Sequence, residues 1–188
     1  MRRRGSAALG DGWHVGIVTV LADETSAVLD VLGIVGGRRF HTGRMAVPGG
    51  VTYLVATPPA GSGGVAAALR GLRDRYDPAV VVLVGHTEGE ATAGEVVVTG
   101  GREPVVGAMA AFFRAAGEPA TLPGYGGDGP FRVVREPAGA DGDVARFCAD
   151  ATTRRGKPLA WAVFQGDTPR NTAQALRYLI PYLRPRIT

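Results

Sequence analysis

Short, almost continuous apolar runs that alternate with segments of helical spacing constrain the fold of this 188-residue chain most strongly. Residues 15–21, 79–84 and 159–164 form three such runs, in which Val, Leu and Ala dominate. Runs of this kind are typical of strands that are buried on both faces, as in parallel sheets. The sequence therefore predicts an α/β fold, a single domain with a mostly parallel or mixed central sheet flanked by helices.

The other elements follow from glycine, proline and apolar spacing. A helix after the first run should end at Gly33, and residues 39–44 and 51–56 should pair as a hairpin. Residues 117–142 are rich in Gly and Pro and hold a single strand candidate, residues 131–135. We also expect a strand over 96–99 and helices over 65–76, 105–116, 143–155 and 172–183, the last kinked or ended by Pro181.

Composition indicates a folded chain with a disordered start. The 29 glycines and 13 prolines approach a low-complexity level, but 45% of the residues are hydrophobic, which is enough for a core. Residues 1–12 have no apolar period and should form a disordered lead-in. Residues 13–188 are long enough for one domain.

The charge pattern argues against a nucleic-acid-binding surface. The net charge of +4 includes Arg2, Arg3 and Arg4, and the other basic residues are scattered without interleaved aromatic residues. No apolar run has the length of a membrane span or of a signal-peptide core. We therefore expect no nucleic-acid partner and no membrane contact. Because the chain has a single cysteine, we also expect a cytoplasmic protein.

Cysteine and histidine usage indicates neither a disulfide nor a metal site. Cys148 is the only cysteine, and its place within a predicted helix favours a core position over a nucleophile. His14, His41 and His86 lack metal-ligand spacing, so we expect no metal and no cofactor.

A glycine-rich loop is the most visible candidate for a ligand site. Gly61, Gly63 and Ala66 fit the weaker form of the dinucleotide fingerprint, although Pro58 and Pro59 occupy the turn. Three interpretations remain open: a nicotinamide or flavin site, glycines that let a helix pack closely on a sheet, or another ligand loop.

Two further candidates follow the carboxyl ends of predicted strands, where ligands gather in open α/β sheets. Glu24 lies in a partly apolar setting that would suit an acid or base, or it is a solvated carboxylate in the first turn of a helix. His86 lies in a sharp turn, residues 85–89, as a catalyst or as a packed, hydrogen-bonded side chain.

Several segments resemble the nucleoside phosphorylase and nucleosidase superfamily, particularly the 5'-methylthioadenosine/S-adenosylhomocysteine nucleosidases. Residues 16–24 are similar to the opening strand of that family, and residues 61–68 to its G-x-G-x-V-x-A-A segment. Residues 94–98 are similar to its G-D-V-V-V signature. Residues 161–167 look like the strand and turn that end in its catalytic aspartate.

The resemblance implies hydrolysis of the N-ribosidic bond of a purine-type nucleoside. Glu24 would deprotonate the attacking water, and Asp167 would protonate the leaving base. Phosphorolysis is disfavoured because residues 19–24 and 85–89 contain no Arg or Lys to hold phosphate. The substrate-binding residues would be Gly61, Gly63, His86, Thr87, Glu88 and Phe164.

The resemblance also implies a homodimer or larger homo-oligomer. The apolar helix around Phe112 and Phe113 would serve that interface, or else the core. The alternative function is a catalytically degenerate member of the family that acts as a nucleoside-binding or protein-interaction module.

Overall fold

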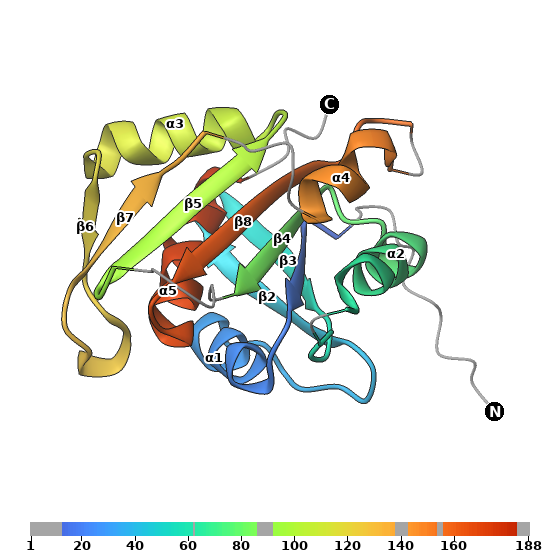
Figure 1. The fold of residues 1–188 in the computed structure, drawn as a ribbon, viewed down its shortest axis with the longest axis horizontal. Coiled ribbons are helices and arrows are strands. Elements are labelled where there is room, and N and C mark those ends of the chain that lie inside the picture. Colours follow the sequence, from blue (N-terminus) through green and yellow to red (C-terminus); the bar gives the residue numbers. More distant parts are fainter. Residues whose placement is uncertain (1–12, 62, 86–91, 138–142, 154–155, 184–188) are drawn as a thin grey trace.

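A computed structural model describes residues 13–61, 63–85, 92–137, 143–153 and 156–183 of the chain (Figure 1). The predicted lead-in, residues 1–12, lies outside the described residues.

The described residues form one eight-stranded mixed sheet, with strand order β2-β3-β1-β4-β8-β5-β7-β6. The four adjacent strands β3, β1, β4 and β8 are parallel to one another, whereas β2 and β5 pair antiparallel with β3 and β8. The predicted α/β fold is thereby confirmed. The strands are β1 (Val15–Thr19), β2 (His41–Val47), β3 (Gly50–Ala56), β4 (Val80–Gly85), β5 (Glu95–Gly101), β6 (Ala120–Leu122), β7 (Phe131–Arg135) and β8 (Ala160–Gly166).

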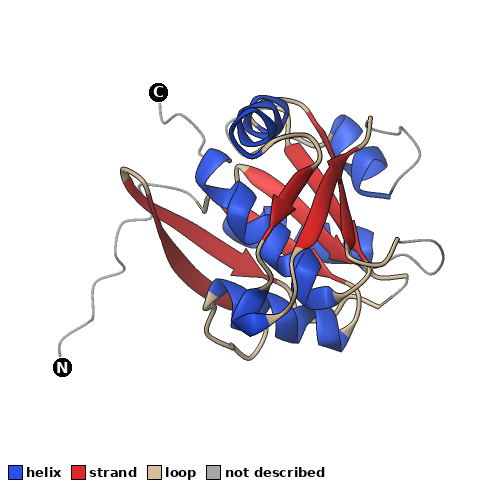
Figure 2. Cartoon of the chain, turned by 90° about the vertical axis from the view of Figure 1, so that its left-hand side faces the viewer, coloured by secondary structure: helices blue, strands red, loops and turns tan. Residues whose placement is uncertain are grey.

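Helices cover both faces of the sheet (Figure 2). Helices α1, α3 and α5 share one core with alternate strand residues such as Val80, Val82 and Val84. Helices α2 and α4 share the second core with residues of opposite orientation such as Val81. The helices are α1 (Ala22–Leu32), α2 (Val65–Tyr76), α3 (Val105–Ala116), α4 (Asp143–Asp150) and α5 (Pro169–Leu179), with short 3₁₀ turns η1 (Tyr125–Gly127) and η2 (Ile180–Tyr182).

The bounds predicted for α2, α3 and β7 are confirmed, and the predicted hairpin is formed by β2 and β3. The helix predicted over 143–155 is too long. It ends at Asp150, and Thr152 then pairs with Pro158 in an isolated bridge. Strand β6, which has three residues, was not predicted.

The last helix begins earlier than predicted, at Pro169, because the hydroxyl of Thr168 caps it. The backbone N–H of Asn171 donates to Thr168 Oγ1 at 3.1 Å, and proline is well suited to the first helical position. Pro181 ends the α-helix as expected, since residues 180–182 form a 3₁₀ turn.

Phe112 and Phe113 belong to the core. Their side chains are 3% and 4% exposed, which confirms the core alternative for these two residues. None of the helices in the described ranges is long and apolar enough to cross a membrane.

Candidate functional site

The carboxyl ends of β1, β4 and β8 bring two predicted catalytic carboxylates to one edge of the sheet. Glu24 follows β1, Gly85 ends β4 and Asp167 follows β8. These three strands are parallel neighbours. Because neighbouring strands lie about 4.8 Å apart, the ends of β1 and β8 are separated by about 10 Å, with β4 between them.

Glu24 is buried in the first turn of α1, with only 1% of its surface exposed. Its Oε2 accepts hydrogen bonds from the backbone N–H groups of Val20 and Leu21, both at 2.8 Å. A methyl group built on Gly85 would lie 3.7 Å from Oε1, which places Oε1 beside the end of β4. The alternative of a solvated carboxylate is therefore wrong.

Two buried threonines support the turn that carries Glu24. The hydroxyl oxygens of Thr19 and Thr25 are 2.5 Å apart, and the hydroxyl of Thr25 lies 3.2 Å from the carbonyl oxygen of Leu21. The turn between β1 and α1 is thus stabilised by these two side chains in addition to the backbone hydrogen bonds of the helix.

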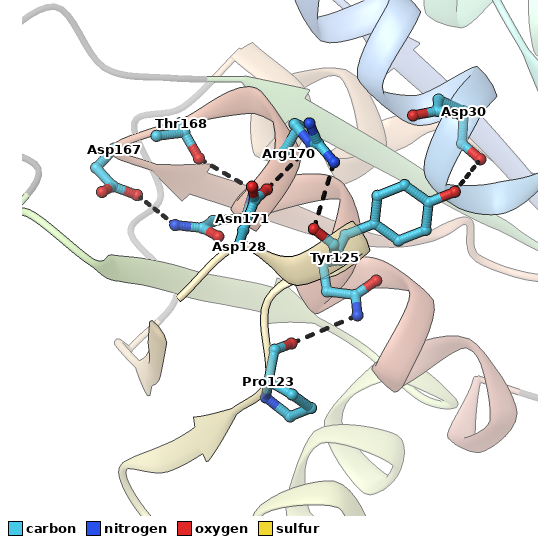
Figure 3. Close-up of polar contacts among 9 residues, drawn as sticks. Asp30, Pro123, Tyr125, Asp128, Asp167, Thr168, Arg170 and Asn171 are labelled. Carbon is cyan, nitrogen blue, oxygen red and sulfur yellow. Dashed lines mark hydrogen bonds and ion pairs between the residues drawn. The ribbon is translucent and has the colours of Figure 1, made fainter. Parts of the chain in front are cut away.

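Asp167 lies between β8 and α5, and both of its carboxyl oxygens accept hydrogen bonds. The side-chain amide of Asn171 donates to Oδ1 at 3.1 Å (Figure 3). The backbone N–H of Gly94 donates to Oδ2 at 2.6 Å. The backbone N–H of Asp167 donates to the carbonyl oxygen of Glu95 at 3.3 Å. Asp167 therefore connects the end of β8 to the beginnings of both β5 and α5.

The loop before β7 is anchored beside the start of α5. The guanidinium of Arg170 pairs with Asp128 at 3.0 Å, donates to the carbonyl oxygen of Tyr125 at 3.3 Å and lies over the Tyr125 ring at 5.4 Å. The Tyr125 hydroxyl donates to the carbonyl oxygen of Asp30 in α1 (Figure 3). These contacts fix the loop against α1 and α5.

The glycine loop also reaches this edge of the sheet. Gly61 has a positive φ of 70°, and its N–H donates to the carbonyl oxygen of Val20. A Cβ on Gly64 would clash with the carbonyl oxygen of Ala60, so close packing of the turn requires glycine there. At Gly63, by contrast, no described residue lies within 4 Å of the place that a Cβ would take. The loop thus places Gly61 next to the turn that holds Glu24.

The other predicted ligand residues are distributed differently. His86, Thr87 and Glu88 lie outside the described residues. Phe164 is fully buried in the core, so its ring offers no surface to a ligand in this conformation.

Burial and hydrogen bonds indicate structural roles for the cysteine and for the two described histidines. Burial raises the pKa of the Cys148 thiol to about 12, against the opposing charge of Arg102, so Cys148 is not a nucleophile at neutral pH. The Nδ1 atoms of His14 and His41 each accept a backbone N–H. Across the part of the chain that the structure describes, no group of three or more His, Cys, Asp or Glu residues could hold a metal ion.

Asn171 and Gly94 were not predicted as site residues. Asn171 follows Asp167 by four residues at the start of a helix, a spacing that brings side chains together and could have indicated the contact. Gly94 gives no comparable signal, because its contact depends on the antiparallel pairing of β5 with β8.

No protein-family model and no curated protein sequence matches this chain. Its fold, however, is shared with solved structures of nucleosidases. A mutant Helicobacter pylori 5'-methylthioadenosine/S-adenosylhomocysteine nucleosidase with 5'-methylthioadenosine in its active site superposes with a TM-score of 0.57 at 10% identity, over 90% of this chain and 99% of that chain.

Futalosine hydrolase shares the fold as well. A mutant of the Helicobacter pylori enzyme gives a TM-score of 0.54 at 10% identity, over 91% of this chain and 98% of that chain. The Campylobacter jejuni 5'-methylthioadenosine/S-adenosylhomocysteine nucleosidase gives 0.51 at 9% identity, over 92% and 98%. The resemblance inferred from the sequence is therefore confirmed at the level of the fold.

Proposed function

We propose that the chain is a nucleosidase that hydrolyses the N-ribosidic bond of a purine-type nucleoside. The observation that carries the proposal is the common position of Glu24 and Asp167 at the carboxyl ends of two parallel strands, on either side of β4. The shared fold supports it, since one neighbour has 5'-methylthioadenosine in its active site.

The reaction needs a base and an acid on opposite sides of the scissile bond. Glu24 takes a proton from water as the water oxygen attacks the anomeric carbon of the sugar. The bond between that carbon and the purine nitrogen breaks, and Asp167 protonates the purine, which leaves as the neutral base. The separation of about 10 Å between the ends of β1 and β8 leaves room for a sugar and part of a base between the two groups.

The positions of the two carboxylates suit these roles. Two backbone N–H groups orient Glu24, and the low exposure of the side chain keeps bulk water away from it. Asp167 is less buried and lies where α5 begins, next to the anchored loop around Tyr125. We include Gly61 among the proposed binding residues because its loop covers the end of β1.

The experiment is a base-release assay over a panel of purine nucleosides that includes 5'-methylthioadenosine, adenosine and inosine. The wild-type chain should release free base from at least one of them in phosphate-free buffer, at a rate that added phosphate does not raise. Phosphate-dependent release would support phosphorolysis instead, and no release from any member would contradict the proposal.

A second candidate is a module that binds a nucleoside without cleaving it. It is favoured by the hydrogen bonds of the two carboxylates, because Glu24 and both oxygens of Asp167 already serve backbone or side-chain donors, as purely structural carboxylates do. Saturable binding of a nucleoside by calorimetry, without base release, would support this candidate over the first.

The proposal extends to a homo-oligomer, as the resemblance implies, and to a location in the cytoplasm, as the single cysteine suggests. Light scattering coupled to size-exclusion chromatography tests the first part. An oligomer should have at least twice the 19.5 kDa mass of one chain, and a mass of one chain would contradict it.

A further inference from the structure

Asn171 makes the side-chain contact to Asp167 that the sequence analysis did not assign. Its Nδ2 donates to Asp167 Oδ1 at 3.1 Å, while Oδ2 is held by the N–H of Gly94 at 2.6 Å. The two donors come from different parts of the fold: Asn171 lies in α5, and Gly94 directly precedes β5. Together they fix both the position and the plane of the carboxyl group.

We propose that Asn171 is a positioning residue that holds Asp167 in place for proton transfer, an inference that rests on the proposed function. The backbone N–H of Asn171 donates a hydrogen bond to the hydroxyl of Thr168, the cap of α5. This bond fixes the backbone from which the Asn171 side chain extends. Each oxygen of Asp167 accepts one of the two hydrogen bonds, which leaves further lone-pair sites for the proton that Asp167 transfers.

The charged side chains around this contact are paired with one another. Arg170, the preceding residue on α5, pairs with Asp128 and contacts Tyr125 (Figure 3). Glu95 on β5 lies 4.0 Å from Arg132 on β7. Among the described residues, Arg170 and Arg132 thus pair with carboxylates other than Asp167, whose side-chain donors there are Gly94 and Asn171.

The small number of side-chain amides in the chain allows the contact between Asn171 and Asp167 to be followed by NMR spectroscopy. Asn171 is the only asparagine in the chain, and Gln165 and Gln174 are the only glutamines. The side-chain amide region of a nitrogen-15 NMR spectrum therefore contains one asparagine group and two glutamine groups. Gln174 serves as an internal control because its Nε2 faces the carbonyl oxygen of Pro123 at 3.5 Å instead.

The first test is a pH titration of these signals in the full chain, and it requires no enzymatic activity. The Asn171 amide should shift as Asp167 gains a proton, and this shift should vanish in Asp167→Ala, which leaves Asn171 as the only asparagine. That control retains every other charged group, including Glu95, Arg132, Arg170, Asp128 and the residues His86 and Glu88 outside the described ranges. A pH-independent Asn171 signal, or the same shift in Asp167→Ala, would overturn the inference.

The second test uses the chemistry of the donor. Asn171→Ala should lower kcat about tenfold with little change in KM, as expected for a lost hydrogen bond to a reacting group. In Asn171→Asp the new side chain donates only when it is protonated, so activity relative to wild type should be retained at acid pH and lost as the pH rises. Asn171→Ala should show no such dependence.

Arg170→Ala is the matched control, because it alters the same helical turn and leaves both donors to Asp167 in place. A wild-type kcat in Asn171→Ala would overturn the inference and leave the proposed function intact. A wild-type chain without base release would overturn the proposed function, and the amide titration would still decide whether Asn171 holds Asp167.

Discussion

A buried carboxylate needs hydrogen-bond donors, and Glu24 obtains two from the backbone of its own turn. The same side chain thereby satisfies the N–H groups of Val20 and Leu21, the two residues that directly precede α1. Glu24 is thus placed by local backbone geometry, and its proposed chemistry and its structural role use the same contacts.

Replacement of Glu24 should separate these two roles. Glu24→Ala leaves the N–H groups of Val20 and Leu21 without their acceptor, so the free energy of unfolding should fall by about 2–4 kcal/mol. Glu24→Gln keeps a side-chain oxygen as acceptor, so its free energy of unfolding should fall by about half as much. Urea denaturation measures both variants, and an unchanged stability in Glu24→Ala would show that the backbone groups are satisfied in another way.

The reactivity of Cys148 should follow its burial. Since thiolate is the reactive form and burial raises the pKa of this thiol to about 12, the folded chain contains almost no thiolate at pH 8. An alkylating reagent should therefore modify Cys148 slowly in the native chain and rapidly in urea. Equal rates in both conditions would contradict the buried position.

At the scale of the element, α5 connects the site to the rest of the fold. Its cap, Thr168, follows Asp167 directly, and its first turn carries Arg170 and Asn171. One helix start thus positions a candidate acid, the residue that holds it and the anchor of the loop before β7.

The cap of α5 should contribute measurably to stability. Thr168→Ala removes the acceptor for the N–H of Asn171 and should cost about 1 kcal/mol, which corresponds to a fall in Tm of about 2–4 °C. Thr168→Ser keeps the hydroxyl and should remain close to wild type. Thermal unfolding followed by circular dichroism measures the Tm of both variants. An equal fall in Tm for the two would mean that the hydroxyl does not cap the helix.

Close contact between strand β1 and the end of α2 should also be detectable. A methyl group on Gly16 would lie 2.8 Å from Pro78 and 3.2 Å from Leu72, so Gly16→Ala should destabilise the chain by about 1–3 kcal/mol. No described residue lies within 4 Å of the place that a Cβ would take on Gly129, so Gly129→Ala is the control, with an expected change within about 0.5 kcal/mol. A tolerated Gly16→Ala would contradict the packing of this interface.

At the scale of the whole molecule, the sequence predicted the elements that carry strong apolar patterns. The α/β class, α2, α3 and β7 follow directly from hydrophobic spacing and from Gly and Pro positions. The early end of α4 and the short strand β6 could not be predicted in this way, because an isolated bridge and a three-residue strand depend on tertiary pairing. Pairing of β5 with β8, which brings Gly94 to Asp167, has no local signal for the same reason.

The candidate site was predicted unevenly. The positions of Glu24 and Asp167 after strands could be inferred, because parallel strands end at one edge of a sheet. Their hydrogen-bond donors could not, and the burial of Phe164 follows from its position between β4 and β5, which the sequence does not reveal. The predicted roles of the site residues remain proposals for experiment.

The most direct test of the proposed nucleosidase function is the rate of base release by four proteins on the best substrate of the nucleoside panel. These are the wild type, Glu24→Gln, Asp167→Asn and Asp30→Asn, the last a change of an exposed carboxylate on the same helix as Glu24. Wild type and Asp30→Asn should release base at similar rates, whereas the other two should be slower by about 10²–10⁴-fold. Equal rates for all four proteins, or no release by the wild type, would contradict the account.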